Sequence, residues 1–261
     1  MMFLKADTVI GRSLDLYGEW CESEMAVLGQ VLRPGDWVLD AGANVGTHTV
    51  FFAKAVGNRG RVVAVEPQRL VRNILCANLA LNDLQNVRVV DAALGAEQGK
   101  VSIAGFGLDE KRNHGRFSLE GAEPGKEKVA VRTVDRLGLK HCHLIKIDVE
   151  GFEREVLQGA ADLIAQKQPA IWFENNVEEH DLALTSWFVE RGYSLHWHFD
   201  GRFNPNNFRA VRRNIFETVK MPSINMLALP VDGREPPRGV MAMEPGDTIE
   251  IARQRWSSRM L

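Results

Sequence analysis

The feature that most constrains the fold is an alternation between short apolar runs and longer amphipathic runs. Five short runs, rich in β-branched residues, are predicted to be strands: "WVLDA" from Trp37, "RVVAVE" from Arg61, "VRVVDAAL" from Val87, "HLIKIDV" from His143 and "PAIWFEN" from Pro169. Between most of them apolar residues recur at steps of three and four, which predicts helices. This pattern indicates a mostly parallel α/β sheet that is buried on both faces. With right-handed crossovers the sheet is doubly wound, and ligands bind beyond the carboxyl ends of its strands.

Three segments interrupt the alternation. Residues 1–31 predict a short extended segment followed by a helix, and residues 105–128 predict a long hairpin or lid between two apparent strands. After Tyr193, "SLHWHF" and "SINMLALP" predict a final strand pair around a basic loop. We therefore expect three parts: an N-terminal segment and helix over 1–36, a main domain over 37–230, and a C-terminal extension over 231–261, either a helix or a loose tail.

Composition excludes several classes of protein. The formal net charge of -2 over 261 residues does not favour nucleic acid or an anionic membrane as a partner. No apolar run approaches the roughly 18 residues that a membrane span needs, so we expect no stable membrane insertion. The 3 cysteines form no CxxC pair, and the first residues do not resemble a secretory signal. We expect a cytoplasmic protein. The sequence leaves open whether it is a homo-oligomer.

The first predicted strand runs into a glycine-containing turn, Asp40-Ala-Gly42-Ala-Asn44-Val-Gly46. Glycines let a backbone approach a ligand closely, and the following helix offers unpaired N–H groups. A phosphate, a carboxylate or a nucleoside would suit such a turn. Asn44 stands where the dinucleotide pattern G-x-G-x-x-G needs its second glycine, and no phosphate-binding GxxxxGK[ST] loop occurs. We expect Asp40 to project its carboxylate into the crevice.

Acidic residues also follow the next two predicted strands. Glu66 ends "VVAVE", and a carboxylate there can accept hydrogen bonds from two ribose hydroxyls, as it also does in NAD sites. Asp91 follows "VRVV" and is placed to accept a hydrogen bond from the amine of an adenine, while the small Ala92 leaves room for the ring. Together with Asp40, these positions predict a site for an adenosyl ligand.

Three motifs resemble one known family. "VLDAGANVGTHT", "VVAVEP" and "LIKIDVEGFEREVLQGA" are similar to class I S-adenosylmethionine-dependent methyltransferases, and specifically to the FkbM family, over roughly Leu16–Pro230. The resemblance implies a Rossmann-like, mostly parallel seven-stranded sheet with helices on both faces and an antiparallel final strand. It also implies a methyltransferase (EC 2.1.1.-) that uses S-adenosyl-L-methionine. Family members mostly O-methylate sugars, glycan precursors or natural products, so we expect a small-molecule or glycan acceptor.

The resemblance assigns cofactor-binding roles by position. The glycine turn would surround the methionine moiety, Glu66 would hold the ribose, and Asp91 with Ala92 would contact adenine. The stretch "YGEW…E" resembles a subset of the family, which implies that Tyr17 and Glu24 close over the cofactor. The full set expected to bind the cofactor is Tyr17, Glu24, Asp40, Gly42, Ala43, Asn44, Gly46, Thr47, Glu66, Pro67, Asp91 and Ala92.

The catalytic candidates lie at the end of the predicted fourth strand. Lys146, Asp148 and Glu150 share one parity, so a regular strand would project them to the same side. Asp148 is placed to take a proton from an acceptor hydroxyl or to orient it. Lys146 is either a second catalytic group or one half of a structural ion pair with Asp148. Much of the catalysis can come from alignment of the acceptor with the methyl group.

Acceptor selectivity is expected in the irregular segments and at the fifth strand end. The residues proposed to contact the acceptor are Asn113, Ser118, Glu174, His198 and Arg202. The basic segment from Arg202 to Lys220 is either a solvated loop or, if it lines the crevice, a site for a phosphate- or carboxylate-bearing acceptor. No metal is expected. If one were bound, Asp148, Glu174 and His198 would be its ligands.

Other functions are weighed against O-methylation. N-methylation of a small molecule is the alternative within the same class of enzyme. An NAD(P)-dependent oxidoreductase would fit Glu66, but the glycine pattern fails, and the 2 tyrosines, Tyr17 and Tyr193, form no Y-x-x-x-K motif. A catalytically silent adenosyl-binding protein is opposed by Asp148 with Glu150. Methylation of nucleic-acid bases is opposed by the missing Asn-Pro-Pro-aromatic signature, so no nucleic-acid partner is expected.

Overall fold

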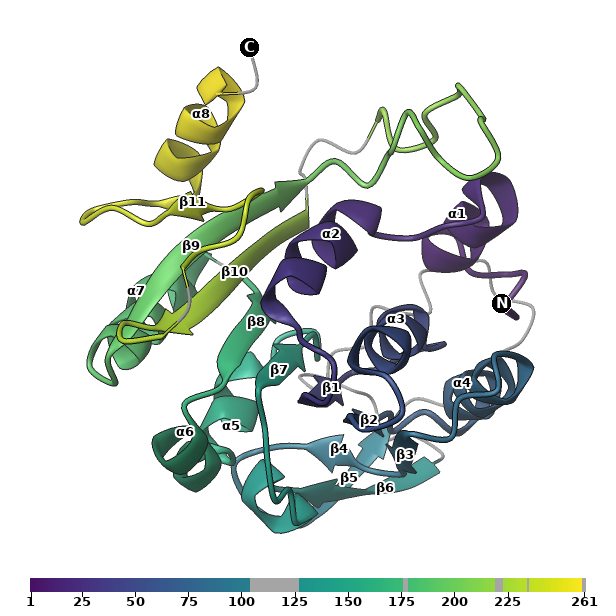
Figure 1. Cartoon of the computed structure of the whole chain (residues 1–261), viewed down its shortest axis with the longest axis horizontal. Coiled ribbons are helices and arrows are strands. Elements are labelled where there is room, and N and C mark those ends of the chain that lie inside the picture. The colour runs from purple at the N-terminus through teal and green to yellow at the C-terminus, as the bar shows by residue number, and fades with distance from the viewer. Residues whose placement is uncertain (104–126, 176–177, 219–222, 234, 260–261) are drawn as a thin grey trace.

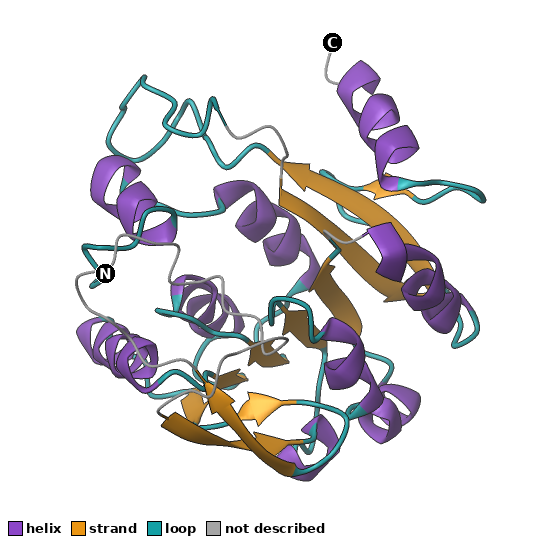
Figure 2. Cartoon of the chain, turned by 180° about the vertical axis from the view of Figure 1, so that it is seen from behind, coloured by secondary structure: helices purple, strands orange, loops and turns teal. Residues whose placement is uncertain are grey.

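The chain forms a large mixed sheet with helices on both faces and a small second sheet beside it (Figures 1 and 2). The computed structural model describes residues 1–103, 127–175, 178–218, 223–233 and 235–259, without the side chains of 178–183 and 259. The predicted class, a mostly parallel doubly wound α/β fold, is confirmed. No helix in these ranges is both long enough and apolar enough to cross a membrane.

The large sheet has eight strands in the order β11-β9-β10-β8-β7-β1-β2-β3. Neighbours from β8 to β3 are parallel, whereas β10 is antiparallel to both β8 and β9, as expected for the final strand. The strands are β1 (Trp37–Ala41), β2 (Arg61–Val65), β3 (Val87–Val90), β7 (Leu144–Ile147), β8 (Ala170–Glu174), β9 (Tyr193–Asp200), β10 (Ser223–Pro230) and β11 (Met241–Ala242).

The expected number of seven strands is corrected to eight. The added strand, β11, pairs with Trp197 and His196 of β9 at the outer edge of the sheet. A two-residue strand has no periodicity of its own, so the sequence gives no signal for it.

The order of the strands places a crevice between β1 and β7. From β1 the chain moves outward to β2 and β3, and it then returns to add β7 on the other side of β1. Connections leave these two strands in opposite directions, which opens a crevice at their carboxyl ends. The turn after Ala41 and the segment after Ile147 meet there.

Side chains of the central strands alternate between two cores. Val38 packs in one core with residues of α2 and α3, whereas Leu39 packs in the other with residues of α5 and α6. The helices on the first face are α2 (Glu22–Val31), α3 (Thr47–Val56) and α4 (Arg69–Leu81), and those on the second are α5 (Glu153–Gln158), α6 (Ala161–Lys167) and α7 (Glu178–Val189). Burial on both faces explains why the strands are apolar at nearly every position.

The predicted strand "VRVVDAAL" is two strands. It leaves the large sheet after Val90 and continues as β4 (Ala93–Leu94) in a three-stranded sheet of order β4-β6-β5. The other members are β5 (Gly99–Ile103) and β6 (Glu127–Arg132), which pair antiparallel as the predicted hairpin requires. A short 3₁₀ helix, η1 (Val134–Leu137), follows β6. The rest of the predicted hairpin or lid lies outside the described residues.

The N-terminal prediction of one helix after an extended segment is wrong. Two helices form, α1 (Ile10–Tyr17) and α2, because the chain turns between them through left-handed backbone at Gly18 (φ 80) and Cys21 (φ 55). At the other end of the chain, α8 (Ile249–Arg259) forms an added helix rather than a loose tail. Its residues Ile249 and Ala252 are buried beside β9.

Candidate functional site

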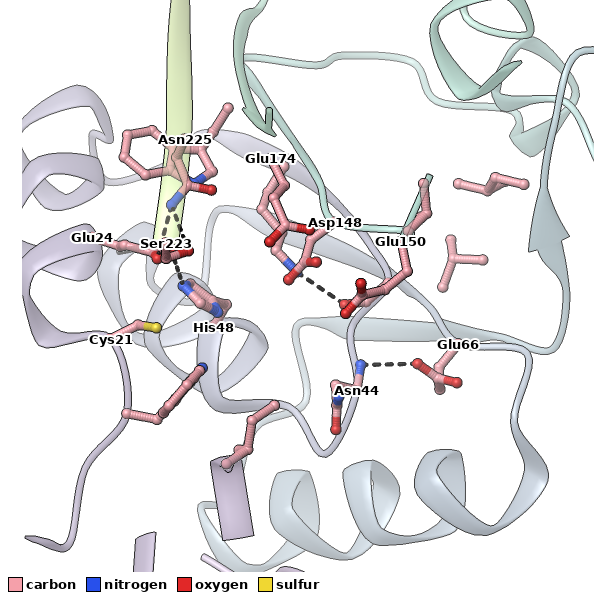
Figure 3. Close-up of a pocket in the computed structure, with 18 of the residues that line it drawn as sticks. Cys21, Glu24, Asn44, His48, Glu66, Asp148, Glu150, Glu174, Ser223 and Asn225 are labelled. Atoms are coloured by element: carbon pink, nitrogen blue, oxygen red, sulfur yellow. Dashed lines mark hydrogen bonds and ion pairs between the residues drawn. The ribbon is translucent and has the colours of Figure 1, made fainter. Parts of the chain in front are cut away.

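The glycine turn after β1 lies directly against the end of β7. Gly42 has φ 77, and a Cβ added to it would lie 1.8 Å from the backbone oxygen of Asp148. A side chain at this position would therefore force the two backbones apart. Asn44 also has left-handed backbone, with φ 51, and its side-chain oxygen accepts a hydrogen bond from Val45 N at 2.7 Å. The turn and the end of β7 thus form adjoining parts of the wall of one cavity (Figure 3).

Glu66 is held rigidly in this cavity by backbone N–H groups. Asn44 N donates to its Oε2 at 3.0 Å, and Gln68 N donates to its Oε1 at 2.8 Å. Burial raises the pKa of this carboxyl to about 7, although the two N–H donors act in the opposite direction. Ala92, Ala93 and Leu94 line the cavity as well, and together they form an apolar part of its wall.

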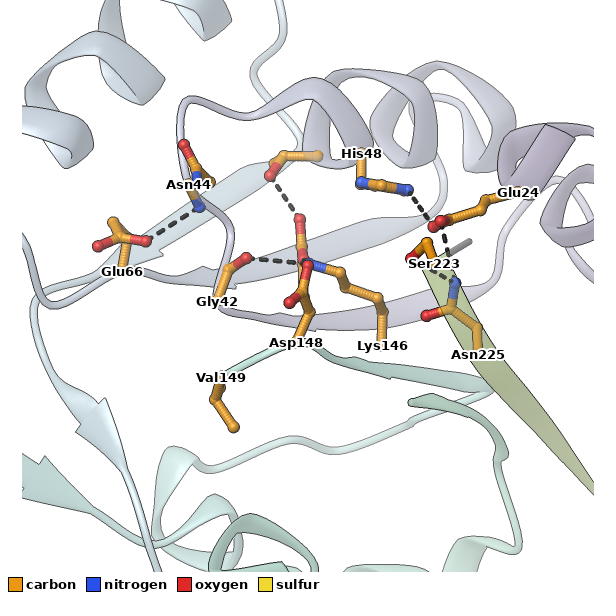
Figure 4. Close-up of polar contacts among 12 residues, drawn as sticks. Glu24, Gly42, Asn44, His48, Glu66, Lys146, Asp148, Val149, Ser223 and Asn225 are labelled. Atoms are coloured by element: carbon orange, nitrogen blue, oxygen red, sulfur yellow. Dashed lines mark hydrogen bonds and ion pairs between the residues drawn. The ribbon is translucent and has the colours of Figure 1, made fainter. Parts of the chain in front are cut away.

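Lys146 joins the turn after β1 to the end of β7. Its Nζ donates to Gly42 O at 2.9 Å and lies 3.4 Å from Asp40 Oδ1 and 3.3 Å from Asp148 Oδ2 (Figure 4). Burial alone would lower the pKa of Lys146, but Asp148 and Asp40 outweigh it and raise that pKa. The ion pair with Asp148, one of the two roles considered for Lys146, is present. The second pair, with Asp40, was not predicted.

The expectation that Asp40 projects into the crevice is wrong. Its side chain is 0% exposed, and Thr49 Oγ1 on α3 donates to Asp40 Oδ2 at 2.6 Å. Asp40 points to the face of the sheet that α3 covers, so its carboxylate lies under the turn and does not line the cavity. Asp40 is linked to the cavity through Lys146, which pairs with it and lines the cavity.

A buried contact between a histidine and a carboxylate forms part of the cavity wall on the side of α2. His48 Nε2 lies 3.3 Å from Glu24 Oε2, and Asn225 Nδ2 donates to Glu24 Oε1 at 3.0 Å. Burial raises the pKa of Glu24, but the contact with His48 outweighs this and the net shift is downward. Glu24 is therefore an ionised carboxylate beside the cavity, held by one residue from α3 and one from β10.

Three further carboxylates gather opposite this pair. One oxygen each from Asp148, Glu150 and Glu174 all lie within 4.8 Å of one another (Figure 3). Glu150 has left-handed backbone, φ 54, so it lies in the turn after β7 and not in the strand. Burial, and then the charges of Asp148 and Glu150, raise the pKa of Glu174 well above its usual value. Such a group attracts cations.

The structure brings together most of the residues predicted from the sequence. Those that line the cavity are Glu24, Gly42, Asn44, Glu66, Pro67, Ala92, Lys146, Asp148, Glu150, Glu174 and Arg202. Those that do not line it are Tyr17, Asp40, Ala43, Gly46, Thr47, Asp91 and His198. Asn113 and Ser118 lie outside the described residues.

Three of the residues away from the cavity have other partners. The hydroxyl of Tyr17 donates to Arg213 O and accepts from Ile215 N, which ties α1 to the loop before β10. The carboxylate of Asp91, 65% exposed, pairs with Arg72 at 2.8 Å. His198 lies behind the wall and contacts Gly239 O and the hydroxyl of Ser23. The combination of Asp148, Glu174 and His198 considered as metal ligands is therefore not assembled: Glu150, and not His198, joins the two acids.

Sequence reasoning missed several lining residues, among them Trp20, Cys21, His48, Trp172, Ser223 and Asn225. His48 directly follows Thr47, the last residue of this segment that was predicted to bind the cofactor, and it lies in the first turn of α3. Its position in the sequence could therefore have identified it. Asn225 had none. It reaches the cavity because β10 pairs with β8 in a register that places Asn225 opposite Glu174.

A family model, a curated relative and a solved structure are similar to this chain. The profile described as "Methyltransferase FkbM domain" matches residues 40–195. The methyltransferase sdnD of Sordaria araneosa is 28% identical over 160 residues, which cover 49% of this chain and 61% of that protein. A crystal structure of methyltransferase FkbM from Methylobacillus flagellatus superposes with a TM-score of 0.54 at 19% identity. The superposition covers 83% of this chain and 51% of the other chain. This chain therefore spans only part of each relative's length.

Proposed function

The chain belongs to the FkbM methyltransferase family, and on that premise we propose that it transfers the methyl group of S-adenosylmethionine to a hydroxyl oxygen of a small molecule or glycan precursor. The position of Asp148 is the observation that supports a hydroxyl, rather than another group, as the methyl acceptor. Its side chain is 43% exposed and lines the cavity at the end of β7, beside the glycine turn. An alcohol must lose a proton when it is methylated, and a carboxylate at this position can accept it.

The described residues fit the cofactor. Glu66 has both oxygens fixed by backbone N–H groups, and the remaining lone pairs can accept hydrogen bonds from two neighbouring ribose hydroxyls. The apolar wall of Ala92, Ala93 and Leu94 suits an adenine ring. Gly42 and Asn44 line the cavity at the turn after β1, where the methionine moiety would lie. When bound, S-adenosylmethionine supplies an electrophilic methyl group on a positively charged sulfur.

The residues of the chain then act through position and charge. Lys146 ties Asp148 to the turn that carries Gly42, which fixes the carboxylate against the cofactor side of the cavity. Asp148 orients the acceptor hydroxyl and takes its proton, so the oxygen lone pair is directed at the methyl group. Alignment of this kind can supply much of the rate enhancement.

A first test is the thermal stability of the chain with S-adenosylhomocysteine, with NAD and NADP as controls. At about 100 times its dissociation constant a ligand adds roughly 2.7 kcal/mol to the free energy of unfolding. We expect the melting temperature to rise by about 5–10 °C, at roughly 2–4 °C per kcal/mol. A rise with NAD and none with S-adenosylhomocysteine would contradict the proposal.

Cofactor affinity should depend on pH through Glu66. The ionised carboxylate accepts hydrogen bonds from the ribose, whereas the protonated form replaces one acceptor with a donor. Because the pKa of Glu66 in the free protein is about 7, affinity for S-adenosylhomocysteine should fall as the pH drops from 8 to 6. The limiting slope is about tenfold per pH unit. Calorimetric titration across this range tests it.

The matched variant is Glu66→Gln. It should bind S-adenosylhomocysteine more weakly at pH 8 and should lose most of the pH dependence between 6 and 8. If the wild-type affinity is flat over this range, Glu66 does not hold the ribose as an ionised acceptor.

A further inference from the structure

A buried thiol and two buried carboxylates meet at one end of the cavity. Cys21 Sγ and one oxygen each of Glu24 and Asp200 lie within 4.8 Å of one another, and all three residues are buried. Cys21 and Glu24 come from the start of α2, whereas Asp200 is the last residue of β9. Figure 3 shows Cys21 and Glu24 on the side of the cavity away from Glu66. The group is therefore distinct from the part of the cavity that fits the ribose.

Asp200 brings to this group a carboxylate with one unpartnered oxygen. Its Oδ1 accepts a hydrogen bond from Arg202 N at 2.8 Å, but its buried Oδ2 has no donor among the described residues. Burial and the charge of Glu24 raise the pKa of Asp200, and the nearby Ser23 hydroxyl offsets this only in part. Asp200 is 8% exposed, so water does not take the place of a donor. Buried polar atoms nearly always have a partner, and this oxygen points to one that the described side chains do not supply.

Glu24 is already oriented within the group. Its Oε1 accepts a hydrogen bond from Asn225 Nδ2 at 3.0 Å, and its Oε2 lies 3.3 Å from His48 Nε2. Each carboxylate oxygen has two lone pairs, so these contacts leave one on each oxygen for a further ligand. Carboxylates that bind metals are commonly held in this way by neighbouring hydrogen bonds.

The group lies where two cavities meet. Cys21 lines the cavity described above and also a second cavity, while Glu24 lines the first and Asp200 the second. A small ion therefore has an entry path to these three side chains although each of them is buried.

We propose that Cys21 Sγ, one oxygen of Glu24 and one oxygen of Asp200 bind a zinc ion. The donor atoms select the metal. Zinc is bound by thiolate and carboxylate ligands, whereas magnesium and calcium take oxygen ligands, and copper(I) favours thiolates and thioethers over carboxylates. Three protein ligands leave the fourth position of a tetrahedral ion open to the cavities. The proposal goes beyond the methyltransferase function and does not depend on it.

The distances allow this coordination after small movements. Zinc–sulfur bonds of about 2.3 Å and zinc–oxygen bonds of about 2.0–2.2 Å place the ligand atoms of a tetrahedral ion roughly 3.3–3.6 Å apart. The three atoms here lie within 4.8 Å, so each pair has to close by at most about 1.5 Å. As the zinc–sulfur bond forms, the thiol of Cys21 loses its proton to solvent.

The ligands were not evident from the sequence, from which no metal was expected. Cys21 and Asp200 lie far apart in the chain and belong to no spacing typical of a zinc site. They meet because α2 packs beside β9. A zinc ion would therefore join the start of that helix to the end of that strand, and it should stabilise the folded chain.

The test uses the full chain, stripped with a chelator and then titrated with zinc and with cobalt(II), which takes zinc sites and absorbs light. We expect about one zinc ion to bind per chain, and cobalt(II) to give a sulfur-to-metal charge-transfer band. Cys21→Ser should lose this band and bind zinc at least about a hundredfold more weakly, since even residues that only orient a ligand are worth 10–100-fold. Asp200→Asn should weaken zinc binding at least about tenfold but keep the band.

The matched control is Cys76→Ser. Cys76 is exposed on α4 and lines neither cavity, so its loss should leave both the band and the zinc affinity unchanged. Zinc should raise the melting temperature of wild type and of Cys76→Ser but not that of Cys21→Ser. The metal-free form of Cys21→Ser should melt close to metal-free wild type, which separates loss of a ligand from loss of the fold.

Three results would overturn the inference. The first is cobalt(II) that gives no sulfur band with wild type. The second is a band and a zinc affinity that survive in Cys21→Ser, and the third is a zinc affinity that is unchanged in Asp200→Asn. Zinc that binds without a sulfur band would belong to the acids at the end of β7 instead. None of these measurements uses S-adenosylmethionine or an acceptor, so their failure would leave the proposed function standing.

Discussion

Replacing Lys146 with methionine is expected to lower the melting temperature of the chain by roughly 6–20 °C. Lys146 is 3% exposed, and its loss would leave the fully buried carboxylate of Asp40 without a counter-ion. Breaking a buried ion pair by removing one partner costs about 3–5 kcal/mol, and a domain of this size loses roughly 2–4 °C per kcal/mol. Thermal unfolding followed by circular dichroism measures the change.

Two variants separate this explanation from a general loss of packing. Lys100→Met removes an exposed lysine from β5 and should change stability by about 0.5 kcal/mol or less. Asp40→Asn combined with Lys146→Met removes the uncompensated charge, so the double variant should be more stable than Lys146→Met alone. A melting temperature of Lys146→Met within about 2 °C of wild type would show that Asp40 does not depend on the ammonium.

Much of the fold could be predicted because the parallel sheet is covered on both faces. Buried strands must be apolar at successive positions, and this produced the runs that identify β1, β2, β7 and β8. The errors have local causes. The break between β3 and β4 falls inside an apolar run, so composition does not mark it. The division of the N-terminal segment into α1 and α2 depends on left-handed backbone at Cys21, a residue type with no preference for it.

The candidate site could be predicted wherever its residues follow parallel strands. The carboxyl ends of such strands share one edge of the sheet, so Glu66, Asp148 and Glu174 were expected at that edge, and all three line the cavity there. Asp40 was misplaced because it lies within β1, where either face of the sheet is covered by helices. A polar side chain inside a central strand is buried, whichever way it points.

The remaining contacts depend on pairing between distant segments. Glu24 comes from α2 and Asn225 from β10, yet Asn225 Nδ2 donates to Glu24 Oε1. That contact requires the register in which β10 joins β8, and register is set by the whole sheet rather than by residues close in sequence. Single-sequence reasoning therefore found Glu24 through the family resemblance alone and had no route to its partner.

Asp148→Asn is expected to reduce the turnover number for methyl transfer by about 10²–10⁴, the range typical for loss of a positioned acid or base. The exchange keeps the size of the side chain but removes the negative charge that accepts the proton. Affinity for S-adenosylhomocysteine should change little, because the pair between Lys146 and Asp40 and the hydrogen bond to Gly42 O remain. The rate is measured with S-adenosylmethionine and an acceptor found by screening hydroxylated small molecules.

The melting temperature of Asp148→Asn distinguishes the loss of a proton acceptor from damage to the fold. The carboxylate of Asp148 is 43% exposed, so Asp148→Asn should melt close to wild type, unlike Lys146→Met. Asp232→Asn, an exposed change outside the cavity, should retain full activity. If Asp148→Asn turns over within about threefold of wild type, the hydroxyl loses its proton by another route. Glu174 and Glu150, whose carboxylate oxygens lie within 4.8 Å of that of Asp148, would then be the groups to exchange next.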